Sequence, residues 1–97
     1  MEYGIKQLVL EEIIRLANVH NIEKIYLFGS RARGDYKERS DIDLATVGGN
    51  HAAFSLDIEE ETSTLLKYDI VNLDGQINDE LYNEIMKEGK VIYEKVR

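Results

Sequence analysis

Gly29 and Ser30 have the residue types of a phosphate-binding turn. They follow a run of β-branched and aromatic residues, 24–28, which predicts a strand that breaks into a turn and then into a helix N-terminus. Because glycine has no Cβ, the backbone at Gly29 can approach a bulky anion closely. Ser30 adds a hydroxyl and free N–H groups at the positive end of the helix dipole. We therefore predict that this turn binds phosphate.

Asp41 and Asp43 form a pair of carboxylates on one face of a second predicted strand, 41–47. Residues two apart on a strand lie roughly 6.6 Å from each other on the same face. Their repulsion costs roughly 2 kcal/mol at an effective dielectric of about 20. A hard divalent cation, which prefers oxygen ligands, turns that repulsion into attraction. The pair therefore predicts a magnesium site. Together with the neighbouring phosphate-binding turn, it predicts a binding site for a magnesium nucleoside triphosphate.

Asp69 is a third carboxylate, on a third predicted strand, 67–73. This strand is otherwise apolar on both faces, which predicts an interior position in the sheet. Asp69 shares a face with Val71 and Leu73, where a carboxylate is costly unless a cation or hydrogen-bond donors compensate it. A hydrogen-bonded aspartate at a strand start is the alternative to a metal ligand.

The spacing of Gly29-Ser30, ten residues and Asp41-Ile42-Asp43 resembles the signature of the DNA polymerase beta type nucleotidyltransferase superfamily. Asp-x-Asp alone is unspecific because surface strands produce it by chance. A Gly-Ser pair directly after an apolar strand, at this distance before 40–44, is a specific pattern. Within the superfamily the chain most resembles the minimal nucleotidyltransferases (MNT), which pair with HEPN-domain proteins in toxin–antitoxin systems. The likeness covers nearly the whole chain, from the helix before Tyr26 to 88–93.

The resemblance implies catalytic and metal-binding roles for the three carboxylates. Asp41 and Asp43 are expected to hold a Mg²⁺ ion bound to the β and γ phosphates of ATP. Together with Asp69, which occupies the position of the family's third metal-site carboxylate, they are expected to hold a second ion near the α-phosphorus. Asp69 is also expected to help deprotonate the acceptor hydroxyl.

Nucleotide binding is expected from the turn and from the loop that follows it. Basic residues are concentrated in this loop, where they could neutralise charge on the leaving phosphates. A merely solubilising loop is the alternative for these basic side chains. The predicted nucleotide-binding residues are Gly29, Ser30, Arg31, Arg33, Arg39 and Ser40, with Lys37 as a further basic candidate.

Length and composition indicate one domain, 1–97, and the lack of cysteine is compatible with a reducing compartment. The chain has 97 residues and no cysteine, so disulfides and thiolate metal sites are excluded. No apolar run approaches membrane length and no basic-then-apolar leader is present, so we expect a cytoplasmic protein that binds no membrane. A net charge of −7 argues against a large nucleic-acid footprint and favours a basic protein partner.

Hydrophobic periodicity predicts three longer helices around these strands. The first ends near Asn21, the second has a weaker stripe, and the last runs from an Asn78 cap to Gly89 before a short strand, 91–93. The stripes of the first two are Ile5, Val9, Ile13 and Leu16, and Phe54, Ile58, Thr62 and Leu65. Together with the resemblance, this order predicts an α/β nucleotidyltransferase fold, a mixed three- to four-stranded sheet with helices packed on it.

The acceptor of the nucleotidyl group is not specified by the residues. Larger relatives carry further domains that bind the base and the acceptor, so we expect a partner to supply that surface. The resemblance implies a HEPN ribonuclease toxin that is neutralised by transfer of AMP from ATP to a tyrosine. Two alternatives stay open: neutralisation by binding alone, and adenylylation of a small molecule such as an aminoglycoside. Apolar residues on the first and last helices leave a homodimer open as well.

Overall fold

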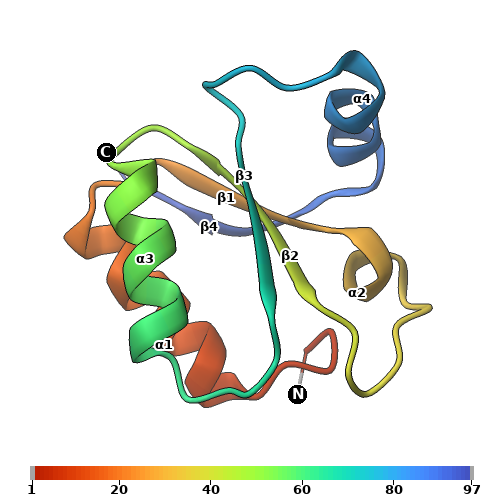
Figure 1. Ribbon diagram of the computed structural model, residues 1–97, viewed down its shortest axis with the longest axis horizontal. Coiled ribbons are helices and arrows are strands. Elements are labelled where there is room, and N and C mark those ends of the chain that lie inside the picture. Colours follow the sequence, from red (N-terminus) through yellow and green to blue (C-terminus); the bar gives the residue numbers. More distant parts are fainter. Residues whose placement is uncertain (1, 97) are drawn as a thin grey trace.

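The structure is a computed structural model that describes residues 2–96 as a mixed four-stranded sheet with helices on both faces (Figure 1). The strand order is β3-β2-β1-β4, with β2 and β3 parallel and the other neighbours antiparallel. The predicted α/β fold with a mixed sheet is confirmed. The elements in chain order are α1 (Gln7–Val19), β1 (Lys24–Phe28), α2 (Gly29–Arg33), β2 (Ile42–Val47), α3 (His51–Glu61), β3 (Tyr68–Asn72), α4 (Asp79–Glu88) and β4 (Lys90–Glu94).

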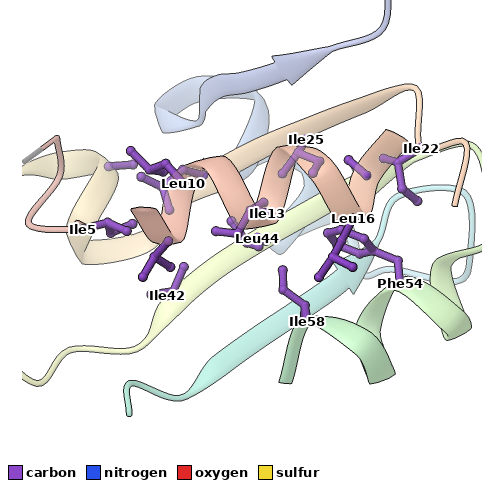
Figure 2. Packing of buried hydrophobic residues seen from close by; sticks show 14 residues of the cluster. Ile5, Leu10, Ile13, Leu16, Ile22, Ile25, Ile42, Leu44, Phe54 and Ile58 are labelled. Carbon is purple, nitrogen blue, oxygen red and sulfur yellow. The ribbon is translucent and has the colours of Figure 1, made fainter. Parts of the chain in front are cut away.

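The larger core lies between one face of the sheet and the pair α1 and α3. Alternate strand residues point into it, because successive side chains of a strand leave on opposite faces. Figure 2 shows Ile13 and Leu16 of α1 close to Ile25 of β1 and Leu44 of β2, with Phe54 and Ile58 entering from α3. This layer fixes the register of β1 and β2, since a slip by one residue would turn their apolar side chains away from it.

The opposite face of the sheet is covered only in part, by α4. Phe28, Ala45 and Ile85 form a small buried cluster there, with partly buried side chains such as Val71 packed around it. In Figure 1, α4 lies well apart from α1 and α3. Because α4 leaves the rest of this face open, polar side chains at the strand ends on this face reach solvent.

The predicted interior position of the third strand is wrong, because β3 is an edge strand that pairs only with β2. Both of its faces are apolar because the two core layers both extend to this edge. Tyr68 and Ile70 pack on the larger cluster, and Val71 and Leu73 pack on the smaller one. Asp69 is therefore exposed, and its carboxylate lacks the desolvation penalty expected for a carboxylate inside the sheet.

The second predicted helical stripe is wrong at its C-terminal end. Helix α3 ends at Glu61, and Thr62 is extended, with its hydroxyl donating to the carbonyl of Ile58 at 2.6 Å. The Glu12 carboxylate then accepts hydrogen bonds from the backbone N–H and the hydroxyl of Ser63, which holds the next segment in a loop. Leu65 consequently lies outside the helix with its side chain fully exposed.

Within residues 2–96 no helix has the length and apolarity required to cross a bilayer.

Candidate active site

Strand register brings the predicted turn and two of the carboxylates to one end of the sheet. Asp43 pairs with Phe28 of β1 on one side and with Asp69 of β3 on the other. Neighbouring strands lie about 4.8 Å apart, and register partners point to the same face. Gly29, which follows Phe28 directly, therefore lies next to Asp43, and Asp69 lies next to Asp43 on the other side. Asp41 enters from the loop immediately before β2.

These residues line an open pocket of about 600 Å³. It contains most of the residues predicted to form the site, together with two that were not predicted as site residues, the apolar Phe28 and the charged Glu84 of α4. Arg31 and Lys37 do not line it. The lining residues are Phe28, Gly29, Ser30, Arg33, Arg39, Ser40, Asp41, Asp43, Asp69 and Glu84.

Asp43 is the electrostatic centre of the pocket. Burial raises the pKa of its carboxyl, and the nearby carboxylates of Asp69, Asp41 and Glu84 raise it further, to about 6, while Arg33 opposes the shift. Concentrated negative charge of this kind favours a bound cation, and an all-oxygen donor set suits a hard ion such as Mg²⁺. No three Asp, Glu, His or Cys side chains within residues 2–96 form a ready-made metal-ligand cluster. The carboxylates are thus close enough to repel one another without converging on one point.

Gly29 lies directly against the Asp43 side chain, in a backbone conformation that favours glycine. Its φ of +72° lies in the left-handed region, and a Cβ added there would overlap the Oδ2 atom of Asp43. From the sequence, we explain this glycine by the close approach of a phosphate to the backbone. The structure adds that the Asp43 carboxylate occupies the space beside it. Helix α2 can begin here because glycine tolerates this backbone conformation.

Arg31 does not face the pocket, contrary to the predicted nucleotide-binding role. Its side chain is 1% exposed, and its guanidinium donates to the backbone carbonyls of Tyr3 at 3.0 Å, Glu38 at 3.1 Å and Ser40 at 2.8 and 3.1 Å. The ring of Tyr36 lies 4.9 Å from the guanidinium carbon. Arg31 therefore fastens the loop that carries Arg39, Ser40 and Asp41, which makes it a positioning residue.

The other three predicted basic residues lie in different environments. Arg33 lines the pocket and is oriented by Asp35 at 3.3 Å and by Glu88 of α4 at 3.5 Å. Arg39 lines the pocket without an ion-pair partner among residues 2–96. Lys37 is exposed outside the pocket, where its backbone N–H donates to the Ser40 hydroxyl at 2.8 Å. Of the four basic side chains, two could therefore contact a ligand directly.

Glu84 is the charged pocket residue that sequence reasoning missed. It precedes Ile85, the buried residue of α4, and belongs to an ordinary amphipathic helix. No spacing in the sequence links it to the motif at 29–43. Only the packing of Ile85 on Phe28 and Ala45 brings it to the carboxylates.

Comparison with known proteins supports the fold and identifies the family. The family model "Polymerase beta, Nucleotidyltransferase" matches residues 11–97. A relative from Methanocaldococcus jannaschii, named "Putative protein adenylyltransferase MJ0604", is 41% identical over 81 residues, covering 74% of this chain and 79% of the relative.

Solved structures share the architecture. A "putative minimal nucleotidyltransferase" superposes with a TM-score of 0.69 at 27% identity, over 93% of this chain and 95% of that one. A chain from a toxin–antitoxin crystal structure with AMP-PNP gives a TM-score of 0.72 over 89% of this chain and 73% of that one; at 22% identity it supports the fold alone. On the family match and the 41% identical relative, this chain belongs to the polymerase beta nucleotidyltransferase family and is a nucleotidyltransferase.

Proposed function

We propose that the protein is a Mg²⁺-dependent adenylyltransferase that transfers AMP from ATP to a tyrosine hydroxyl of a HEPN toxin, for which it acts as antitoxin. The main support is the cluster of Asp41, Asp43 and Asp69 beside the Gly29-Ser30 turn, where burial and the neighbouring carboxylates together raise the pKa of Asp43 to about 6. Further support comes from the relative named as a protein adenylyltransferase and from folds solved in toxin–antitoxin crystals, one with AMP-PNP.

Each part of the site has a task in this reaction. The Gly29-Ser30 turn binds the terminal phosphates of ATP, and Arg33 and Arg39 offset their charge. Asp41, Asp43 and Asp69 would hold the divalent ions, which when bound would stabilise the entering and leaving oxygens of an in-line displacement. Phosphate oxygens of ATP would add to these carboxylate donors, because no three Asp, Glu, His or Cys side chains within residues 2–96 form a metal-binding group by themselves.

Transfer then follows from the position of Asp69 at the open edge of the sheet. The exposed Asp69 carboxylate accepts the proton of the acceptor hydroxyl while the hydroxyl oxygen bonds to the α-phosphorus. The bond from the α-phosphorus to the bridging oxygen of the β-phosphate breaks, and pyrophosphate leaves toward the Gly29-Ser30 turn. The product is an adenylylated acceptor.

A labelling experiment tests the proposal. The chain is incubated with ATP labelled at the α-phosphate, Mg²⁺ and the protein encoded next to it, and intact mass gives the number of AMP groups added. We expect label on that protein with wild type and none with Asp43→Asn. Neutralisation of the partner by Asp43→Asn to the same extent as by wild type would contradict the proposal in favour of binding alone. Label on an aminoglycoside but not on protein would contradict it in favour of a small-molecule acceptor.

A further inference from the structure

A second, larger groove of about 780 Å³ adjoins the active-site pocket. It is bounded by the N-terminal segment at Ile5 and Lys6, by the loop at Arg39 and Asp41, and by the segment before β3 that carries Leu65 and Lys67. Figure 1 shows the N-terminal end, the α3–β3 connection and the α2–β2 loop at the same end of the molecule. Asp41 and Arg39 line both cavities, so the groove meets the pocket at one of the three candidate catalytic carboxylates, Asp41.

Three of the side chains that line the groove are cationic. Lys6, Arg39 and Lys67 are exposed, and none of them makes an ion pair with any residue from 2 to 96. The acidic residues of its lining are Glu38 and Asp41. The lining thus has three cations against two carboxylates, with the Glu12 carboxylate bonded to Ser63 at its edge, so cations are more concentrated here than in the chain as a whole, whose net charge is −7.

The location of the groove assigns it to one of the two reactants. An in-line displacement places the attacking hydroxyl and the departing pyrophosphate on opposite sides of the α-phosphorus. If the terminal phosphates lie on the Gly29-Ser30 turn, the acceptor enters from the other side of Asp41. That side is the groove, and the hydrogen bond from the N–H of Ile42 to the carbonyl of Lys67, at 2.8 Å, fixes Lys67 close to Asp41.

From this arrangement we infer that the groove binds the acceptor, and that the acceptor is an acidic segment of a partner protein that bears the reacting hydroxyl. The inference rests on the proposed function. Lys6 and Lys67, which line the groove but not the pocket, pair with carboxylates that flank the hydroxyl, and the exposed side chain of Leu65 offers an apolar contact for an aromatic ring. The hydroxyl oxygen forms its bond to the α-phosphorus, its proton passes to Asp69, and pyrophosphate leaves through the pocket.

Peptide binding without nucleotide tests the groove by itself. Two fluorescein-labelled peptides are compared by anisotropy at low salt: a tyrosine flanked by glutamates, and the same sequence with glutamines. Overall charge repels the acidic peptide from this acidic chain, so a preference for it can come only from local cations. Because exposed ion pairs contribute up to about 1 kcal/mol, we expect wild type to favour the glutamate peptide roughly fivefold. Equal or weaker binding of the glutamate peptide would overturn the inference.

Matched charge reversals locate the effect. Lys67→Glu is expected to abolish the preference for the glutamate peptide. Lys95→Glu makes the same change in net charge at the opposite end of the sheet, where the backbone N–H of Lys95 bonds to Glu23, and is expected to preserve the preference. Equal losses in the two variants would overturn the inference, because they would indicate an effect of net charge only.

Titration with ATP separates the acceptor groove from a nucleotide site. Calorimetry with Mg²⁺ and ATP is expected to give the same affinity for wild type and Lys67→Glu; a matching loss of ATP affinity would overturn the inference by placing nucleotide in the groove. If the glutamate peptide binds as expected but no adenylyl group reaches any protein, the proposed function fails while the groove assignment stands. Transfer to the neighbouring protein with identical kinetics in wild type and Lys67→Glu would overturn the groove assignment alone.

Discussion

At the scale of single residues, the site crowds carboxylates together around Asp43, and a bound cation would relieve their repulsion. Asp43 is half-buried among Asp41, Asp69 and Glu84, and this environment raises its pKa from 3.8 to about 6. The ionised carboxylate therefore destabilises the protein when no cation is bound. Such a group is retained where charge is needed for binding, because folding alone would favour its replacement.

Asp43→Asn is expected to stabilise the metal-free protein at pH 8. A raised carboxyl pKa contributes stability that is fully present below pH 3.8 and is lost as the pH rises through about 6. After allowance for solvent screening of a half-exposed group, the gain at pH 8 is about 1 kcal/mol, and it shrinks towards zero near pH 4. Thermal unfolding in EDTA at the two pH values measures it. Glu60→Gln on the exposed face of α3 is the control, and a lower Tm of Asp43→Asn at pH 8 would contradict this interpretation.

Gly29→Ala is expected to cost more stability than Gly34→Ala. Both glycines have positive φ, +72° and +94°, so both variants carry the backbone strain of about 1 kcal/mol. Only the Cβ at position 29 meets a neighbour, the Asp43 carboxylate, whereas nothing lies within 4 Å of a Cβ at position 34. Urea unfolding compares the two variants, and calorimetry with ATP is expected to register lost binding in Gly29→Ala alone. Equal stability losses would show that the overlap with Asp43 is unimportant.

At the scale of elements, the site depends on a loop that belongs to neither helix nor strand. The connection from α2 to β2 carries Arg39, Ser40 and Asp41, and the carbonyls of Glu38 and Ser40 are held by the buried guanidinium of Arg31. The same guanidinium binds the carbonyl of Tyr3, so the N-terminal segment is part of the same assembly. Loss of Arg31 should therefore loosen a wall of both cavities at once.

Arg31→Met and Arg33→Met are expected to give opposite results. Hydrogen bonds to a charged group contribute about 1.5–3 kcal/mol, so removing the Arg31 guanidinium should lower the free energy of unfolding by roughly 2–3 kcal/mol. Arg33 is exposed and outside the core, so its replacement should change stability by less than about 0.5 kcal/mol but weaken ATP binding. Chemical unfolding and calorimetry measure both quantities. A fully stable Arg31→Met protein would contradict the positioning role.

The sequence predicts elements well where a local pattern determines them. Strand β1 has the predicted bounds 24–28, β2 begins one residue after the predicted start, and α4 begins after the predicted Asn78 cap. The edge position of β3 was not predictable, because apolar residues on both faces fit an interior strand as well as an edge strand covered by two layers. Glu84 and the burial of Arg31 both arise from contacts across the fold, which no spacing in the chain encodes.

At the scale of the whole molecule, positive and negative side chains line two different cavities that adjoin each other. The chain has a net charge of −7, yet the cations at the groove and the carboxylates of the pocket meet at Asp41. Two adjoining cavities with different charge suit a reaction in which an anionic nucleotide and a second reactant approach from two sides. It also means that salt should weaken acceptor binding at the exposed cations, since exposed charges are screened within about 10 Å at 0.1 M ionic strength.

The most direct test of the site is calorimetry with ATP, with and without Mg²⁺, on wild type, Asp43→Asn and Asp69→Asn. If Asp41, Asp43 and Asp69 hold the ions in front of the Gly29-Ser30 turn, wild type binds ATP only with Mg²⁺, and each variant loses most of that binding. Ligand at 100 times its Kd should also stabilise wild type by about 2.7 kcal/mol, an increase that thermal unfolding can verify. If wild type binds ATP equally well without Mg²⁺, or if Asp69→Asn binds ATP as tightly as wild type, the assignment of this site is contradicted.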